Sequence, residues 1–189
     1  MSEAALQKLK TRLRDGVLST HSQCGDETAV IERSLLHETC RWLHDDEDLA
    51  FTMLSDLTAA DYLTMGRSPR FEVVYHLYSV SKKHRLRIKV GVPADDAAVD
   101  TVSDIWANAN WCEREVWDLY GIRFEGHPDP RRILLYEEFV GHPLRKDYPK
   151  HKRQPLIRRP AEEIAQAMSG RPGSGKVPGR SARDIAEGL

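Results

Sequence analysis

Glu113 and Glu115, separated by one residue, are the pair of side chains whose type best suits acid–base chemistry in this sequence. General acid–base catalysis needs carboxyl groups in a cleft, together with a matched third group. Nothing in the sequence supplies a nucleophile to go with them. We therefore expect no active site within this chain.

Metal and redox chemistry is equally unsupported. Cys24, Cys40 and Cys112 are separated by 15 and 71 intervening residues and form no CxxC pair, whereas a cluster or structural zinc site needs about four soft ligands. His127 and Asp129 could begin a metal site, but no second group of ligands follows them. A turn in which Asp129 caps its own backbone is the expected alternative. We expect no metal, flavin or nicotinamide in this chain, and thiols that are buried or idle.

The two glutamates lie on a helix predicted from Asn110 to Tyr120. Asn110 suits the N-cap position, and Glu113 three residues later completes the pattern of a capping box. Gly121 follows as the left-handed residue that ends the helix. Arg114 and Asp118, four residues apart, are close enough to pair.

Two residues of this helix stand on unexpected sides. A wheel of about 100° per residue places Glu113 on the apolar side and Trp111 on the opposite side, among the charged residues Arg114, Glu115 and Asp118. A buried carboxylate needs a cation or several donors, and an exposed tryptophan needs a cover. Either Glu113 is partly solvated as a capping residue and Trp111 folds over a loop, or a sheet covers one side of the helix and a partner covers the other. Glu115 could then reach an arginine outside the domain.

The elements that must position this helix form an α+β fold. We expect a two-layer domain with a mixed or antiparallel sheet covered by helices on one face, followed by a long extended C-terminal arm. Strict alternation over residues 86–92 predicts a hairpin with 71–80. The other predicted elements are helices at 3–14, 34–44 (with Ser34 as N-cap) and 99–106, and strands at 17–20, 28–32 and 49–57.

Beyond residue 125 prolines recur every few residues, which excludes long helices and central strands. We expect an α+β domain over 1–125, a partner-wrapping arm over 126–161, and a short helix with a flexible tail over 162–189. The part of the arm over 141–159 is predicted to be poorly ordered alone and to become ordered against a partner protein.

Charge divides along the same line. Residues 1–130 carry 15 Lys/Arg against 22 Asp/Glu, a net charge of −7, and residues 131–189 carry 13 against 7, a net charge of +6. A basic extended segment can lie on an acidic protein surface or on nucleic acid phosphates. Aromatic residues are not interleaved with the basic ones and no phosphate-binding glycine loop is present, so a nucleic-acid-binding protein is the more distant alternative.

One pattern resembles a known family. Glu113-Arg114-Glu115-x-x-Asp118-Leu119-Tyr120, followed by His127 and Arg131-x-Ile133-Leu134, is similar to the defining motif of the thirty-kilodalton subunit of respiratory complex I, which is the C subunit of the bacterial NADH:quinone oxidoreductase. The stretch GHPLRKDYP at 141–149 resembles the second recurrent stretch of that family. The residues that the resemblance assigns to the motif and an interface are Glu113, Arg114, Glu115, Asp118, His127, Arg131, His142, Arg145, Lys146, Asp147 and Tyr148.

The resemblance implies a non-catalytic subunit in the peripheral arm of a proton-translocating complex, on the cytoplasmic side of the bacterial cell membrane. Its partners would be the large quinone-site subunit and the small cluster-bearing subunit, with FMN, iron–sulfur clusters and quinone held by partner subunits. It would bind no nucleic acid and would reach the membrane only through its partners. The equivalent subunit of a membrane-bound nickel–iron hydrogenase is the alternative within the same class.

Composition agrees with a soluble domain. The chain has 189 residues, 30% of them charged, and no run of about 18 apolar residues that could cross a bilayer. The first residues have the features of neither a secretory signal nor a transit peptide, so we expect a cytoplasmic protein.

The absence of clustered ligands and of a glycine-rich nucleotide fingerprint makes a direct prediction. The purified chain should bind no flavin, iron, zinc or nicotinamide. Elemental analysis and an absorption spectrum of the isolated protein check this, and stoichiometric metal or a visible chromophore would contradict it.

Overall fold

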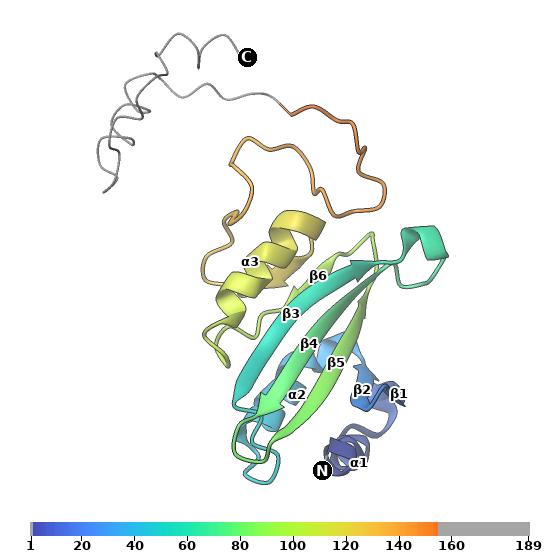
Figure 1. Ribbon diagram of the computed structural model, residues 1–189, viewed down its shortest axis with the longest axis vertical. Helices are drawn as coiled ribbons and strands as arrows, with labels where there is room; N and C mark the ends of the chain where they lie inside the picture. The colour runs from blue at the N-terminus through green and yellow to red at the C-terminus, as the bar shows by residue number, and fades with distance from the viewer. Residues whose placement is uncertain (1, 155–189) are drawn as a thin grey trace, which may run out of the picture. The chain divides into compact units, whose positions relative to one another are not determined.

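A computed structural model of the chain describes residues 2–154 (Figure 1). The last residues of the predicted arm, 155–161, and the predicted helix and tail at 162–189 lie outside the described residues. The compact unit formed by the described residues ends at Arg153.

A five-stranded sheet of order β1-β2-β5-β4-β3 forms the centre of the fold. Neighbouring strands are antiparallel except β2 and β5, which run parallel, so the sheet is mixed, one of the two expected arrangements. The expected hairpin is β4 with β5, paired from Phe71 with Val92 to Ser79 with His84. The strands are β1 (Val17–Gln23), β2 (Asp26–Ile31), β3 (Met53–Asp61), β4 (Phe71–Ser79) and β5 (His84–Val92).

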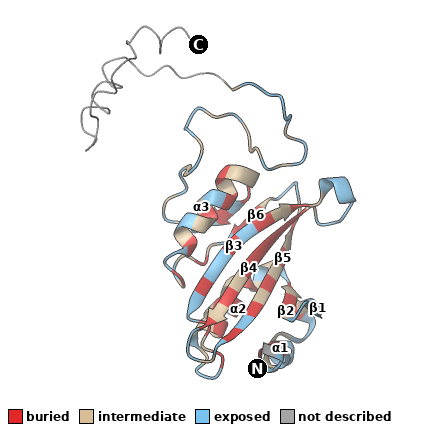
Figure 2. Cartoon of the chain, viewed as in Figure 1, coloured by how far each residue is buried: buried red, intermediate tan, exposed pale blue. Residues whose placement is uncertain are grey.

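One face of this sheet carries the hydrophobic core. Side chains alternate along a strand, so Val73 and Tyr75 of β4 and Ile88 of β5 point inward and are fully buried, whereas Arg87 and Lys89 point to the other face and are partly exposed (Figure 2). Helices α1 (Ser2–Leu13), α2 (Leu36–Asp45) and α3 (Ala109–Tyr120) contribute to that same core. The α+β class with helices on one face of a mixed sheet is therefore confirmed.

Several predicted boundaries are wrong. The strand expected at 49–57 begins only at Met53, because residues 46–49 form a turn around the Asp46 carboxylate, which accepts the Leu49 N–H at 3.0 Å. Ser34 is no N-cap, since a 3-10 turn (Arg33–Leu35) precedes α2.

The helix expected at 99–106 is a strand followed by one turn. Strand β6 (Ala98–Asp100) pairs in parallel with β7 (Arg123–Glu125), a strand that the sequence did not predict, and the Trp106 N–H then donates to the Val102 carbonyl. Three-residue strands carry too little alternation to be read from a sequence, and the i, i+3, i+4 spacing of apolar residues favoured a helix.

No helix or strand occurs between residues 126 and 154, although this segment lies close to α3 (Figure 1). The predicted division after residue 125, with an arm that follows it, stays a prediction. Within the described residues, no helix is long and apolar enough to cross a membrane.

Candidate functional site

The motif residues lie on α3 and on residues 126–154, the segment that crosses this helix and is called the crossing segment below. Glu113 is fully buried, as the helical wheel predicts. Its Oε1 accepts the Val102 N–H at 2.7 Å and its Oε2 accepts the Thr101 hydroxyl at 2.5 Å. Two donors from the strand-to-helix connection, and no arginine or lysine, therefore satisfy this carboxyl group.

The predicted capping box is wrong. The N-cap of helix α3 is Asn108, two residues earlier than the expected Asn110, and Asn108 makes no side-chain capping bond. Its amide donates instead to the Leu54 carbonyl at 2.7 Å, which ties the start of α3 to strand β3. Glu113 thus holds a neighbouring connection and not its own helix start.

Burial raises the pKa of Glu113 to about 7, against the lowering effect of the Thr101 and Val102 hydrogen bonds, and the charge of Asp104 adds to the rise. Near neutral pH, Glu113 is therefore a mixture of carboxyl and carboxylate forms.

His127 stands beside Glu113, with 3.8 Å between its Nε2 and Glu113 Oε2. Its Nε2 bonds to the Asn110 carbonyl at 3.1 Å, and its Nδ1 accepts the Asp129 N–H at 3.0 Å. The neutral imidazole with its proton on Nε2 satisfies both bonds. The expected self-capping turn at Asp129 is therefore wrong, because its amide bonds to the histidine ring while its carboxylate pairs with Arg131 at 2.6 Å.

Asp118 is the unexpected member of the site. The wheel placed it on the charged side of the helix, yet it is fully buried. Its Oδ1 accepts from Arg132 at 2.5 Å, and its Oδ2 accepts the backbone N–H groups of Ile133, Leu134 and Leu135 at 3.2, 2.9 and 2.9 Å. Burial alone would raise the pKa of Asp118, but these four bonds outweigh it and hold the pKa below its ordinary value.

Arg114 does not pair with Asp118, so that prediction is also wrong. Its guanidinium donates to the backbone carbonyls of Arg131 at 3.0 Å and Arg132 at 2.9 Å. Arg114 and Asp118 therefore both bond to the backbone of the same crossing segment, Arg114 to its carbonyls and Asp118 to its amides.

The GHPLRKDYP stretch satisfies the end of α3. His142 Nδ1 bonds to the Asp118 carbonyl at 2.9 Å, and the Leu144 N–H donates to the Leu119 carbonyl at 3.1 Å. These carbonyls belong to the last turn of the helix, where no intrahelical partner exists.

Arg145 completes this arrangement. Its Nε donates to the Tyr120 carbonyl at 2.5 Å and its Nη2 to the Gly121 carbonyl at 3.3 Å. A cation at this end of a helix also interacts favourably with the helix dipole. Gly121 has a φ of +72°, and a Cβ there would lie 2.6 Å from the ring of His142, so both conformation and space call for glycine.

A cluster outside the motif holds the same stretch to the sheet. Asp61, at the end of β3, accepts from Arg70 at 3.0 and 2.7 Å and from the Lys146 N–H at 2.9 Å. Arg70 also donates to both carboxylate oxygens of Asp147, at 3.1 and 2.9 Å. Burial would raise the pKa of Asp61, but the bonds from Arg70, Lys146 and Leu63 lower it to about 2. No local pattern predicts this cluster, because its members are up to 86 positions apart.

The predicted site residues thus divide into two groups. Those that bond within the chain are Glu113, Arg114, Asp118, His127, Arg131, His142, Arg145 and Asp147. Tyr148 stacks on Phe139 with ring centroids 6.1 Å apart. Glu115 and the Lys146 side chain are exposed and make no hydrogen bond or ion pair with another described residue. Arg132, Asp61 and Arg70 are the members of the site that sequence reasoning missed.

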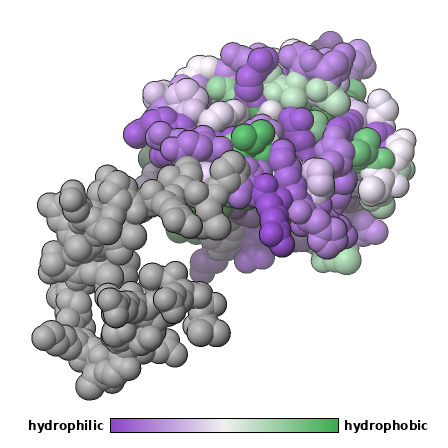
Figure 3. All heavy atoms as spheres, turned by 90° about the horizontal axis from the view of Figure 1, so that it is seen from above, coloured by the Kyte–Doolittle hydropathy of each residue, from purple (hydrophilic) through white to green (hydrophobic). Residues whose placement is uncertain are grey.

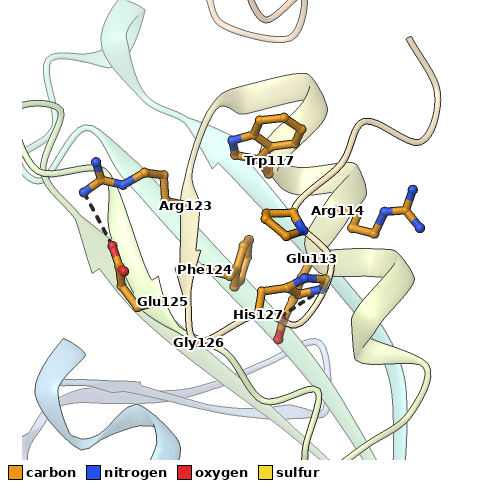
Figure 4. Close-up of a pocket in the computed structure, with 9 residues that line it drawn as sticks. Glu113, Arg114, Trp117, Arg123, Phe124, Glu125, Gly126 and His127 are labelled. Atoms are coloured by element: carbon orange, nitrogen blue, oxygen red, sulfur yellow. Dashed lines mark ion pairs between the residues drawn. The ribbon is translucent and has the colours of Figure 1, made fainter. Parts of the chain in front are cut away.

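A cavity of about 330 Å³ lies beside α3, and the side chains of Glu113, Arg114, Trp117, Phe124, His127 and Pro130 are among those that line it (Figure 4). In the part of the chain that the structure describes, no three His, Cys, Asp or Glu side chains are grouped to hold a metal. The thiols of Cys24, Cys40 and Cys112 are free.

The family model described as "Respiratory-chain NADH dehydrogenase, 30 Kd subunit" matches residues 29–154, a range that includes α3 and the crossing segment. This chain belongs to that family. The resemblance inferred from the motif is therefore confirmed.

Relatives of this NADH dehydrogenase subunit support the same family assignment. The C subunit of the NADH-quinone oxidoreductase of Geobacter sulfurreducens is 48% identical over 145 residues, which cover 77% of this chain and 88% of the relative. The same subunit of Burkholderia thailandensis is 46% identical over 152 residues, covering 78% and 76%.

Two solved structures share the fold of this chain. The trypsin-resistant fragment (1–134) of Nqo5 is 35% identical, with a TM-score of 0.58, and covers 66% of this chain and 98% of the fragment. A chain of the membrane-bound sulfane sulfur reductase, an archaeal respiratory membrane complex, has a TM-score of 0.62 over 95% of this chain and 99% of its own length. At 20% identity the second shows a common fold only.

Glu113→Ala should destabilise the isolated chain more than Glu115→Ala. The first change leaves the Val102 amide and the Thr101 hydroxyl without their acceptor in a buried place, which costs about 1–3 kcal/mol, whereas the second removes an exposed side chain and should cost less than about 0.5 kcal/mol. Chemical denaturation of the two variants measures the difference, and equal small effects would contradict the role of Glu113.

Glu113→Gln separates the effect of protonating Glu113 on stability from the effect of its hydrogen bonds, because glutamine does not titrate. Because folding raises this pKa from 4.5 to about 7, the stability that the bound proton contributes is fully present below about pH 4.5 and is lost as pH rises through about 7. The wild-type chain should therefore lose stability relative to Glu113→Gln between about pH 5 and about pH 8, by up to roughly 3 kcal/mol. A difference that does not change with pH would show that Glu113 titrates normally.

Proposed function

We propose that this chain is a non-catalytic structural subunit in the peripheral arm of a proton-translocating NADH:quinone oxidoreductase. It packs on the large quinone-site subunit and the small cluster-bearing subunit, on the cytoplasmic side of the membrane, and it holds no FMN, cluster or quinone itself. Its contribution to electron transfer from NADH to quinone is to stiffen the subunits that do hold them.

The proposal is supported by the hydrogen-bond partners of the charged motif residues. A catalytic carboxylate or arginine needs a free bonding position toward a substrate, but Asp118, Arg114 and Arg145 spend their hydrogen bonds on backbone groups of their own chain. These bonds fix a segment without secondary structure on α3 and leave the outer side of the helix uncovered. A rigidly held segment beside an uncovered helix face is what we expect of a surface that binds a partner subunit.

Trp111 marks this uncovered side. It stands on the first turn of α3 with 68% of its surface exposed, one helical turn from the exposed Glu115. Tryptophan is strongly enriched among residues that dominate protein–protein binding energy. We propose that Trp111 inserts into the large neighbouring subunit and that Glu115 meets a cation there.

The names of relatives supply the identity of the complex. Similar proteins, at 42–48% identity, carry the name of the C subunit of NADH-quinone oxidoreductase. The fold also occurs in a sulfane sulfur reductase complex, so the fold alone does not separate NADH dehydrogenase from other respiratory complexes. The sequence identity favours the NADH dehydrogenase.

Trp111→Ala tests the proposed docking face, and Val80→Ala is its matched control. Val80 is also apolar and 57% exposed, but it lies in the turn between β4 and β5. Loss of a central tryptophan should weaken assembly by about 30-fold, while both isolated variants should melt like the wild type. The measurements are the amount of this chain recovered with a tagged quinone-site subunit and the NADH:quinone activity of membranes. Equal recovery of both variants would contradict the docking face, and metal-free catalysis by the isolated chain would contradict the structural role.

A further inference from the structure

The loop between β3 and β4 projects beyond the end of the sheet, where Figure 1 shows it as a short turquoise helical turn. This turn, Leu63–Met65, carries two exposed apolar side chains, Leu63 at 44% and Met65 at 71% exposure. On the side of the molecule seen in Figure 3, hydrophobic residues form small separate patches in a hydrophilic surface. The two exposed apolar side chains at this projecting tip therefore call for a functional explanation, such as contact with a binding partner.

The tip is held rigidly at its base. The Tyr62 N–H donates to the Arg70 carbonyl at 2.8 Å, and the Leu63 N–H donates to Asp61 Oδ1 at 2.9 Å. The Tyr62 hydroxyl donates to Glu72 at 3.0 Å, and the Arg67 guanidinium lies 4.1 Å from the Tyr62 ring centre. Since the backbone is already fixed, a partner that binds Leu63 and Met65 loses little free energy to ordering the loop.

The same base joins the tip to the basic segment 145–153. Asp61 and Arg70, at the two ends of the loop, bond to the Lys146 amide and to the Asp147 carboxylate. The segment contains five Lys/Arg and one Asp, a net charge of +4. Lys146, Lys150 and Arg153 are exposed, and none of the three makes an ion pair with any other described residue.

We propose that the tip loop and this basic segment form one docking surface for a protein subunit that offers an apolar pocket rimmed by Asp and Glu. The inference rests on the proposed function and adds a second contact to the Trp111 face. Apolar anchors at the centre and polar side chains at the rim are the usual composition of a protein interface. An acidic rim is required because Lys146, Lys150 and Arg153 would otherwise face the partner without counter-charges.

A lipid surface fits these residues less well. Binding in the membrane interface uses a continuous apolar face of an amphipathic helix, whereas this tip offers two side chains on a three-residue turn.

A competition in cells tests the proposal with the full chain and the whole complex. Tagged wild-type chain and an untagged variant are co-expressed, and the ratio of the two in the purified complex is measured by mass spectrometry. Leu63→Ser with Met65→Ser should lower the incorporated fraction by about tenfold. Val80→Ser in the opposite turn is the control and should incorporate like the wild type.

The charged rim has its own variant. Replacing Lys146, Lys150 and Arg153 by glutamine should also reduce incorporation, whereas Lys83→Gln in the control turn should not. All of these side chains are exposed, so the thermal melts of the isolated variants should match the wild type and exclude misfolding.

A photo-crosslinking side chain at position 65 identifies the occupant. A crosslink to an Asp- or Glu-rich segment of another subunit supports the proposal, while a crosslink to lipid alone or normal incorporation of the Leu63 and Met65 variant overturns it. If Trp111→Ala fails to assemble while the tip variants assemble normally, this inference falls and the proposed function stands. If the wild-type chain is absent from the complex, the proposed function itself falls.

Discussion

Residues 126–154 contain no helix or strand, so the buried backbone groups among them must find hydrogen-bond partners in turns, side chains or water. Asp118 is the hydrogen-bond partner of the amides of Ile133, Leu134 and Leu135. Its buried carboxylate accepts three consecutive amides and the Arg132 side chain, and it can remain charged inside the protein only because those four donors are present. Helix and segment therefore require each other: without the segment the carboxylate loses its donors, and without the carboxylate the segment loses its anchor.

The other polar residues of the motif extend this principle. Arg114 bonds to the carbonyls next to those amides, while His142 and Arg145 satisfy the last carbonyls of α3. A set of charged residues that suggests catalysis thus acts as a scaffold for backbone groups. The cluster of Asp61 and Arg70 then fixes the same stretch to the end of the sheet, so that the exposed side chains on either side of it keep a defined geometry.

The features of the fold that depend on neighbouring residues could be predicted from the sequence. Alternation of apolar and charged residues predicted the β4–β5 hairpin, and a helical wheel predicted the burial of Glu113. The same wheel failed for Asp118, because its cover comes from residues 131–135 and a wheel contains only the residues of its own helix. The pairing of β6 with β7 and the contact of Asp61 with Lys146 join residues far apart in the sequence, and neither has a local signal.

Asp118 fixes the crossing segment within the isolated chain, before any partner is present. Amide hydrogen exchange at Ile133, Leu134 and Leu135 in the purified full-length protein near neutral pH tests it most directly, with Asp118→Ala as the comparison. We predict that these three amides exchange much more slowly than in an unstructured peptide and that the protection disappears in Asp118→Ala. Exchange at unstructured-peptide rates in the wild-type chain would contradict the claim, because the segment would then be held by its partners and not by this carboxylate.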